Sequence, residues 1–261
     1  MKILVPVKVV ASLDEDFALK DATTIPREAL EWQLNEWDSF SLEAALQLSE
    51  GAEEDCEVVA VTVGGEQAEQ GLRSCLAKGA DRAIRVWDDS LEGADALAVA
   101  FVLAAVARAE QPQLVLSGVQ SSDAVESATG IALAGLLDLA HVAVVTSIEL
   151  VGDRLRVARE LEGGVVELLS VSLPCLLTVQ TGINEPRYAT LRAIKHASAK
   201  PLAVSDLGEL GLDAESVGAH AGSRTLHLSE PVKAGGATML DGGPPEVAAR
   251  IATIIREAMG A

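Results

Sequence analysis

Apolar runs alternate with amphipathic stretches along the first half of the chain. The pattern predicts buried β-strands at residues 2–10, 57–63, 82–86, 114–116 and 141–150. It predicts helices from Ser39 or Ser41 to about residue 49, and at 66–78, 94–109 and 126–137. Strands and helices that alternate through short connections are typical of an α/β fold with a doubly wound parallel sheet. Residues 11–38 are polar and predict a long loop.

The pattern changes after about residue 146. Residues 147–161 and 164–172 alternate apolar and polar positions around two glycine turns, which predicts antiparallel strands added at the edge of the sheet. Residues 176–179 predict one more short buried strand. Residues 205–243 show no clear period and predict an extended arm. The arm ends in an amphipathic helix at about 245–259, which docks either on another subunit or on its own domain.

Composition narrows the class of protein. A length of 261 residues with 49% hydrophobic but only 3% aromatic residues indicates one large α/β domain with an aliphatic core. The formal charge of -19 argues against a nucleic-acid partner. The three cysteines and four histidines lack the spacing of metal ligands, and we expect no metal. The apolar segment at 94–107 is too short for a membrane span, so we expect no membrane insertion and a cytoplasmic protein.

One stretch reverses the acidic character of the chain. No Asp or Glu occurs between Glu185 and Asp206, and the basic side chains there are Arg187, Arg192, Lys195, His196 and Lys200. This reversal indicates either a contact surface for an acidic partner or phosphate, or a solvated loop and helix without a specific role.

A nucleotide site is expected where the parallel strands end. Open α/β sheets bind ligands at the carboxyl ends of their strands, near the point where strand order reverses. The loop after the first strand, residues 35–38 and residues 118–123 are predicted to converge there. The polar side chains and helix start of the third loop suit a phosphate, although an ordinary capped helix fits as well. We find no catalytic set and no glycine-rich phosphate motif, so binding without turnover is expected.

The run T-V-Q-x-G-I-N-E-P-R-Y-A-T-L-R-x-I, from Thr178 to Ile194, resembles the signature of the electron transfer flavoprotein β subunit. Further matches extend from Lys2 to the last residues. The segments 34–38, 75–82 and 86–89 resemble in particular a methylotroph-type β subunit that serves trimethylamine dehydrogenase.

The resemblance implies that the doubly wound sheet is of the adenine-nucleotide-binding type and that this chain binds a structural AMP, while an α subunit holds the redox-active FAD. It also implies that Trp37 lies near the flavin of the partner, and that a second aromatic contact of some relatives is replaced by Leu13. The implied cofactor-binding residues are Pro6, Asn35, Glu36, Trp37, Asp38, Val63, Gln120, Ser121, Ser122, Asp123, Ala124, Val125, Glu126, Ser127, Ala128, Thr129, Gly130 and Ile131.

The resemblance also gives the basic stretch a role. In the family, a loop at this place docks the dehydrogenase and inserts a leucine, which corresponds here to Leu191. The implied docking residues are Tyr188, Ala189, Thr190, Leu191, Arg192, Ile194 and Lys195. The expected organisation is a nucleotide-binding domain at 1–204, with the docking loop at 182–200, and an arm at 205–261 that packs on the partner subunit.

The implied function is that of the small subunit of a heterodimeric electron carrier without catalytic residues. It accepts electrons from a primary dehydrogenase, such as trimethylamine dehydrogenase, and passes them to an acceptor such as a quinone oxidoreductase. Two alternatives stay open: an ATP-binding sensor of the universal stress type, and an electron-bifurcating relative with FAD in place of AMP.

Overall fold

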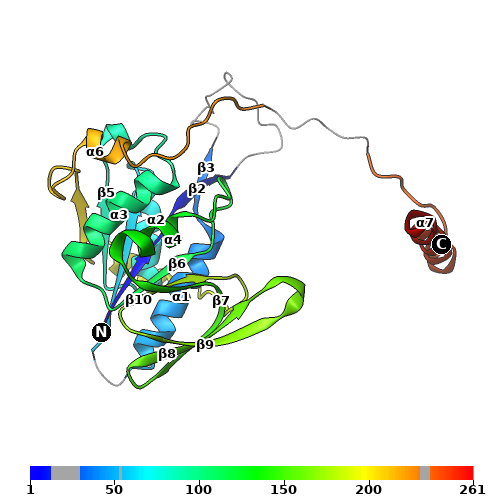
Figure 1. Cartoon of the computed structure of the whole chain (residues 1–261), viewed down its shortest axis with the longest axis horizontal. Coiled ribbons are helices and arrows are strands. Elements are labelled where there is room, and N and C mark those ends of the chain that lie inside the picture. Colours follow the sequence, from blue (N-terminus) through cyan, green and yellow to red (C-terminus); the bar gives the residue numbers. More distant parts are fainter. Residues whose placement is uncertain (13–29, 53–54, 230–235, 261) are drawn as a thin grey trace. The chain divides into compact units, whose positions relative to one another are not determined.

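The computed structural model describes residues 1–12, 30–52, 55–229 and 236–260 (Figure 1). The described residues up to Leu226 form one compact unit, and those from His227 onward form a second.

The compact unit contains a mostly parallel sheet. The described strands follow the order β11-β5-β4-β1-β6-β10-β7-β8-β9. The parallel strands are β1 (Lys2–Pro6), β4 (Glu57–Val63), β5 (Arg82–Val86), β6 (Leu114–Gly118), β7 (Ala140–Val151), β10 (Cys175–Val179) and β11 (Leu202–Ser205). The antiparallel edge consists of β8 (Arg154–Glu160) and β9 (Val166–Ser172). The predicted α/β class, the parallel sheet and its antiparallel edge are therefore confirmed.

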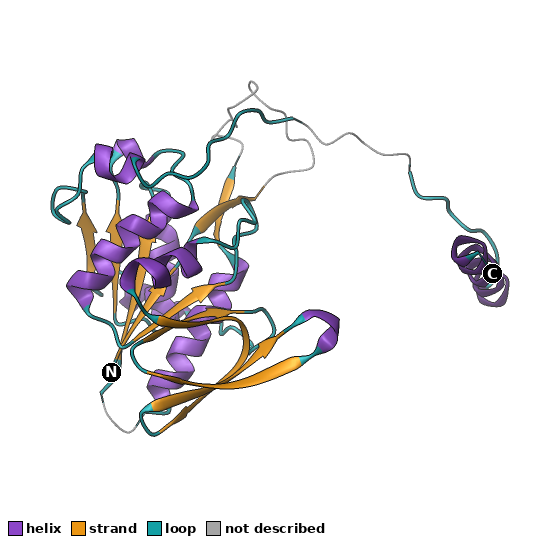
Figure 2. Cartoon of the chain, viewed as in Figure 1, coloured by secondary structure: helices purple, strands orange, loops and turns teal. Residues whose placement is uncertain are grey.

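Helices cover both faces of the sheet (Figure 2). One face packs against α1 (Glu36–Glu50) and α2 (Ala68–Lys78), and the other packs against α3 (Ala96–Glu110) and α4 (Thr129–Leu137). Successive side chains of a strand point to opposite faces of the sheet. Ile3 therefore lies in the core on the α1 side, and Leu4 lies in the core on the α3 side. A strand buried on both faces reads as a continuous apolar run, which is why these strands were visible in the sequence. Shorter helices are α5 (Leu191–Ala197), α6 (Ala214–Gly218) and the 3-10 turns η2 (Asp89–Leu91) and η3 (Glu162–Gly164).

The strand predicted at residues 2–10 is confirmed only as far as Pro6, because the chain leaves the sheet after Val7. The backbone N–H of Lys8 donates to Asp38 Oδ2 at 2.7 Å, and its carbonyl accepts from Asn35 N at 2.9 Å. The chain then forms β2 (Val9–Ser12), which pairs antiparallel with β3 (Glu31–Leu34) in a separate two-stranded sheet. The loop predicted at 11–38 therefore ends in a strand and a first helical turn.

Two predicted helix starts are also wrong. Helix α1 begins at Glu36 instead of at Ser39 or Ser41, and the Ser41 hydroxyl donates to Asp38 O inside the helix at 3.1 Å. Helix α4 begins at Thr129 instead of at residue 126, because Val125 and Ser127 have φ values of 54° and 51°, outside the helical region.

The compact unit extends beyond the expected boundary at 204/205. Leu207 and Val217 are buried against the α3 side of the core, and the unit continues to Leu226. The second unit contains α7 (Pro244–Met259), which confirms the predicted terminal helix. Ile251, Ile254 and Ile255 of α7 are each about half exposed. No helix among the described residues is long and apolar enough to cross a membrane.

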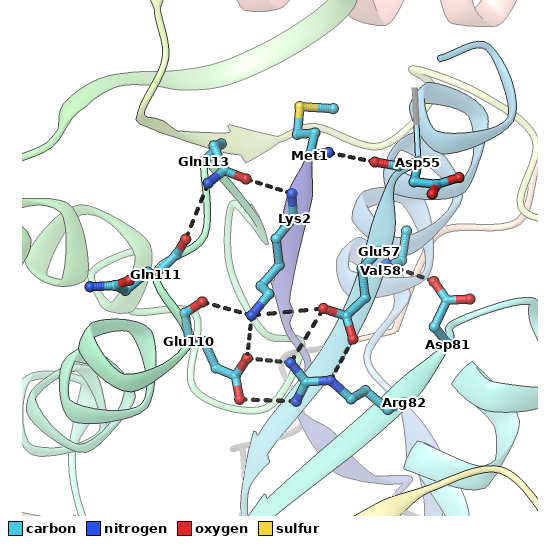
Figure 3. Close-up of polar contacts among 10 residues, drawn as sticks. All are labelled: Met1, Lys2, Asp55, Glu57, Val58, Asp81, Arg82, Glu110, Gln111 and Gln113. Atoms are coloured by element: carbon cyan, nitrogen blue, oxygen red, sulfur yellow. Dashed lines mark hydrogen bonds and ion pairs between the residues drawn. The ribbon is translucent and has the colours of Figure 1, made fainter. Parts of the chain in front are cut away.

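An ion-pair cluster joins the amino ends of β1, β4 and β5 (Figure 3). Lys2 Nζ lies 3.0 Å from Glu110 Oε2 and 3.7 Å from Glu57 Oε2. The Arg82 guanidinium donates to both carboxylates, with Nε 2.6 Å from Glu57 Oε1 and Nη1 2.9 Å from Glu110 Oε1. Hydrogen bonds from Arg82 lower the pKa of both carboxyl groups. The cluster borders a surface cavity of about 700 Å³ at this edge.

We predict that Arg82→Lys lowers the free energy of unfolding by about 1–2 kcal/mol at pH 7, because an ammonium cannot span both carboxylates as the planar guanidinium does. Since the folded-state pKa values of Glu57 and Glu110 are depressed below 4.5, the stabilisation is present above that pH and lost as pH falls through the folded values. Urea unfolding at pH 7 and pH 3 checks both points. A variant as stable as the parent at pH 7 contradicts the prediction.

Candidate functional site

The predicted site loops leave the sheet at one edge. Pro6 ends β1, Val63 ends β4 and Gly118 ends β6, and these three strands run parallel as neighbours. The chain proceeds from β1 to β4 on one side, whereas β6 lies on the other side. Strand order therefore reverses between β1 and β6, which is where open α/β sheets bind ligands.

Asp38 joins the two strands at this reversal. Its buried carboxylate accepts from Lys8 N at 2.7 Å through Oδ2 and from Gly118 N at 3.2 Å through Oδ1. A Cβ at Gly118 would lie 2.4 Å from Asp38 Oδ1 and 2.7 Å from Trp37 Cβ, so only glycine fits there. The first turn of α1 is thereby held directly against the end of β6.

Asn35 and Lys8 bind the loop that follows β6. Asn35 Nδ2 donates to Gln120 O at 2.8 Å, and Asn35 Oδ1 accepts from Ser122 N at 3.2 Å. Lys8 Nζ lies 2.7 Å from Asp123 Oδ1 and 3.2 Å from Ser121 Oγ. The segments 35–38 and 120–123, distant in the sequence, therefore form one polar assembly.

The next part of the loop faces solvent. The exposed residues are Ala124, Val125, Glu126 and Ser127. Ser127 Oγ donates to Gln120 Oε1 at 3.1 Å, and Glu126 Oε2 accepts from Ala96 N, at the start of α3, at 3.3 Å.

Helix α4 then begins with N–H groups that have no acceptor within the helix. Ala128, Thr129 and Ile131 are half-buried, and Gly130 is buried, where a Cβ would lie 2.8 Å from Thr178 Cγ2. Exposed hydroxyls beside a helix start form a donor set that fits a phosphate-bearing nucleotide. Glu36 is exposed on the first turn of α1.

Trp37 is half-buried and donates from Nε1 to Gln180 Oε1 at 3.1 Å. The sequence did not identify Lys8 or Gln180 as site residues, and it placed Gly118 in a site loop without its contact to Asp38. Lys8 could have been identified from the sequence, because it is a charged residue within an apolar run, two residues after Pro6. Leu13, which replaces an aromatic residue of some relatives, lies outside the described residues.

Three apolar side chains of the predicted docking segment project into solvent. Tyr188 is 96% exposed, Leu191 81% and Ile194 52%. Arg192 and Lys195 are exposed beside them, and Thr190 caps α5 by accepting from Ala193 N at 3.2 Å. Ala189 instead packs against the core.

The basic stretch is only partly a free surface. Arg187 pairs with Glu43 and Glu50 of α1, and Lys200 Nζ donates to the carbonyls of Leu76 and Ala80 at 3.1 and 2.7 Å. The interpretation of all its charges as one contact surface is therefore wrong for these two residues. Within the part of the chain that the structure describes, no cluster of His, Cys, Asp and Glu side chains is suited to hold a metal ion.

The fold is that of an α/β protein with a doubly wound, mostly parallel sheet whose switch point carries polar loops. Residues 23–210 match the electron transfer flavoprotein domain. The chain is 47% identical over 265 residues to the electron transfer flavoprotein β subunit of Methylophilus methylotrophus, which covers 100% of both chains. The chain belongs to the electron transfer flavoprotein family.

Other relatives agree with this membership. The β subunit of Bacillus subtilis is 34% identical over 89% of each chain. A subunit of the caffeyl-CoA reductase–Etf complex of Acetobacterium woodii is 33% identical over 98% of each chain. The resemblance found in the sequence is confirmed, and it favours the electron-carrier hypothesis over the universal-stress alternative.

Burial raises the pKa of Asp38 to about 7, although hydrogen bonds from Lys8 and Gly118 act in the opposite direction. Because the folded pKa exceeds the unfolded value of 3.8, the contribution of Asp38 to stability is full below the unfolded value and declines as pH rises toward 7.

We predict that, between about pH 4 and pH 7, the free energy of unfolding of the parent falls by on the order of 4 kcal/mol relative to that of Asp38→Asn. Loss of one hydrogen bond in the variant adds an offset that does not depend on pH. Urea unfolding of both proteins across this range measures the difference, and a constant difference contradicts a raised pKa.

Proposed function

We propose that this chain is the small subunit of a heterodimeric electron transfer flavoprotein in the cytoplasm. It accepts electrons from a primary dehydrogenase, such as trimethylamine dehydrogenase, and supports their transfer to an acceptor such as a quinone oxidoreductase. The observation that carries the proposal is the 47% identity to a β subunit along the whole of both chains. The free thiols of Cys56, Cys75 and Cys175 are consistent with a reducing compartment.

In this proposal, AMP binds at the carboxyl edge of the sheet. The N–H groups of the first turn of α4 supply donors for its phosphate, and the Ser127 hydroxyl, which donates to Gln120 Oε1 in this structure, turns to the phosphate when AMP binds. Pro6 and Val63 lie at the ends of adjacent strands. Asn35, Lys8 and Asp38 act indirectly, because their side chains hold the loop and the strand ends in place. The nucleotide is structural, so no residue here has to transfer a proton.

The electrons are carried by FAD, which we propose is held mainly by the α subunit. Trp37 is the residue of this chain that we assign to the wall of the flavin site, with its ring oriented by Gln180. The exposed apolar face of α7 is proposed to pack on the α subunit as well, since Ile251, Ile254 and Ile255 are otherwise about half exposed to solvent.

The dehydrogenase is proposed to dock on the surface formed by Tyr188, Thr190, Leu191, Arg192, Ile194 and Lys195, called here the docking surface. Leu191 is its central anchor, because a leucine that is 81% exposed gains most from burial in a partner's pocket.

We predict that Leu191→Ala lowers the rate of electron transfer from trimethylamine dehydrogenase by about 10-fold or more, because truncation of a central interface anchor costs about 2 kcal/mol or more. Stopped-flow reduction of the purified heterodimer measures the rate at subsaturating dehydrogenase. FAD content is expected to stay unchanged, since FAD is proposed to be held mainly by the α subunit and Trp37, not Leu191, is assigned to its wall.

Leu168→Ala is the matched control, because Leu168 is 73% exposed on β9 and lies outside the docking surface. Its electron-transfer rate is expected to equal that of the parent. Equal rates for Leu191→Ala and the parent would refute the role assigned to Leu191.

A further inference from the structure

The segment that leads into the docking surface is bound along helix α1. Gln180 accepts from Trp37 Nε1 at 3.1 Å, and Asn184 Nδ2 donates to Phe40 O at 3.1 Å. Arg187 then pairs with side chains further along the same helix. Residues 180–187 therefore contact α1 at several successive levels and reach the docking surface at Tyr188.

Arg187 makes the strongest of these contacts. Its Nε lies 2.8 Å from Glu43 Oε2 and its Nη2 3.0 Å from Glu43 Oε1, while its backbone N–H donates to the same carboxylate at 3.2 Å. The guanidinium also donates to Glu50 Oε2 at 3.0 Å. One arginine thus spans two turns of α1, which a shorter or single-point cation cannot do.

The contact with Glu43 is more important than the contact with Glu50, because the Glu43 side chain is buried. The Glu43 side chain is 5% exposed, whereas that of Glu50 is 60% exposed. Burial by itself would raise the pKa of Glu43, but the hydrogen bonds from Arg187 outweigh it and lower the pKa. Glu43 is therefore a buried anion whose charge is matched by the residue immediately before the docking surface.

Packing at this interface is incomplete. A cavity of about 210 Å³ lies beside it, lined by Ala44, Gln47 and Leu48 of α1 and by Ile183 and Asn184 of the bound segment. Ile183 of the segment packs against the hydrophobic core, and beyond it the segment is held on α1 by the polar contacts of Asn184 and Arg187.

The opposite end of α1 belongs to the candidate nucleotide site. Its N-cap Asn35 holds the loop after β6, and Asp38 holds the ends of β1 and β6. We propose that α1 is the shared support of both sites, and that Arg187 is the positioning residue that fixes the docking surface to it. This inference rests on the docking role assigned above to residues 188–195.

A positioning role and a merely structural role predict different results. If Arg187 orders the docking surface before a partner arrives, its loss adds an ordering cost to docking and raises the dehydrogenase concentration needed for half-maximal transfer. The maximal rate and the FAD content then stay the same. A structural role would instead lower global stability and flavin content without a selective effect on docking.

The experiment uses the complete heterodimer with Arg187→Gln, Arg187→Lys and Glu50→Gln. We expect Arg187→Gln to speed amide hydrogen exchange in residues 188–197 about 10-fold and to raise the half-saturating concentration of trimethylamine dehydrogenase about 10-fold. Arg187→Lys is expected to fall between Arg187→Gln and the parent. Glu50→Gln, at an exposed position, gives a smaller effect of the same kind and serves if Arg187→Gln does not fold.

Arg156→Gln is the matched control, because Arg156 forms an exposed ion pair with Glu149 at 2.9 Å on the β7–β8 hairpin. It is expected to leave both measurements unchanged.

Hydrogen exchange at the parent's rate in the Arg187 and Glu50 variants overturns the inference, whatever the docking measurement gives. If Leu191→Ala slows transfer but Arg187→Gln does not, the inference fails while the docking proposal stands. If Leu191→Ala has no effect, the docking proposal fails, and hydrogen exchange still decides whether Arg187 orders residues 188–197.

Discussion

The carboxylate of Asp38 is the contact on which the arrangement of the site depends. It accepts N–H groups from Gly118, the last residue of β6, and from Lys8, two residues after the end of β1, so it links the two strands between which strand order reverses. Without this acceptor, the buried N–H of Gly118 would lose its hydrogen bond at a cost of about 1–3 kcal/mol. The same contact makes the chain leave the sheet after β1 and sets where α1 begins.

Helix α1 holds two other segments of the chain in place, one at its start and one along its length. At its start, Asn35 holds the loop after β6, so that exposed hydroxyls lie beside the first turn of α4. Along its length, it binds the segment that ends at Tyr188. In the proposed function the subunit needs no reactive side chain, because its proposed task is to hold a nucleotide, a flavin wall and a docking surface in fixed relation.

The sequence predicted the layers of the fold well, for a local reason. Strands such as β1 and β4 are buried on both faces, so their interior residues are almost all apolar and the run is visible without tertiary information. The predicted site residues were also brought together, since parallel strands end at one edge of a sheet. The long apolar–polar alternation of β7–β9 likewise identified the antiparallel edge.

The errors arose where distant contacts override local pattern. The end of β1 is set by Asp38, which lies 30 residues away from Lys8 in the sequence. The late start of α4 follows from the positive φ of Val125 and Ser127, two residue types that give no such signal. Arg187 looked like a free surface charge because its partner Glu43 lies 144 residues away.

We propose above that the carboxyl edge of this sheet holds a structural nucleotide. Purifying the heterodimer, denaturing it and identifying the released nucleotides by mass and amount tests this directly. We expect one AMP and one FAD per heterodimer. Two FAD without AMP would make the edge a redox site of the bifurcating kind, and ATP or no nucleotide besides FAD would contradict the assignment of these loops.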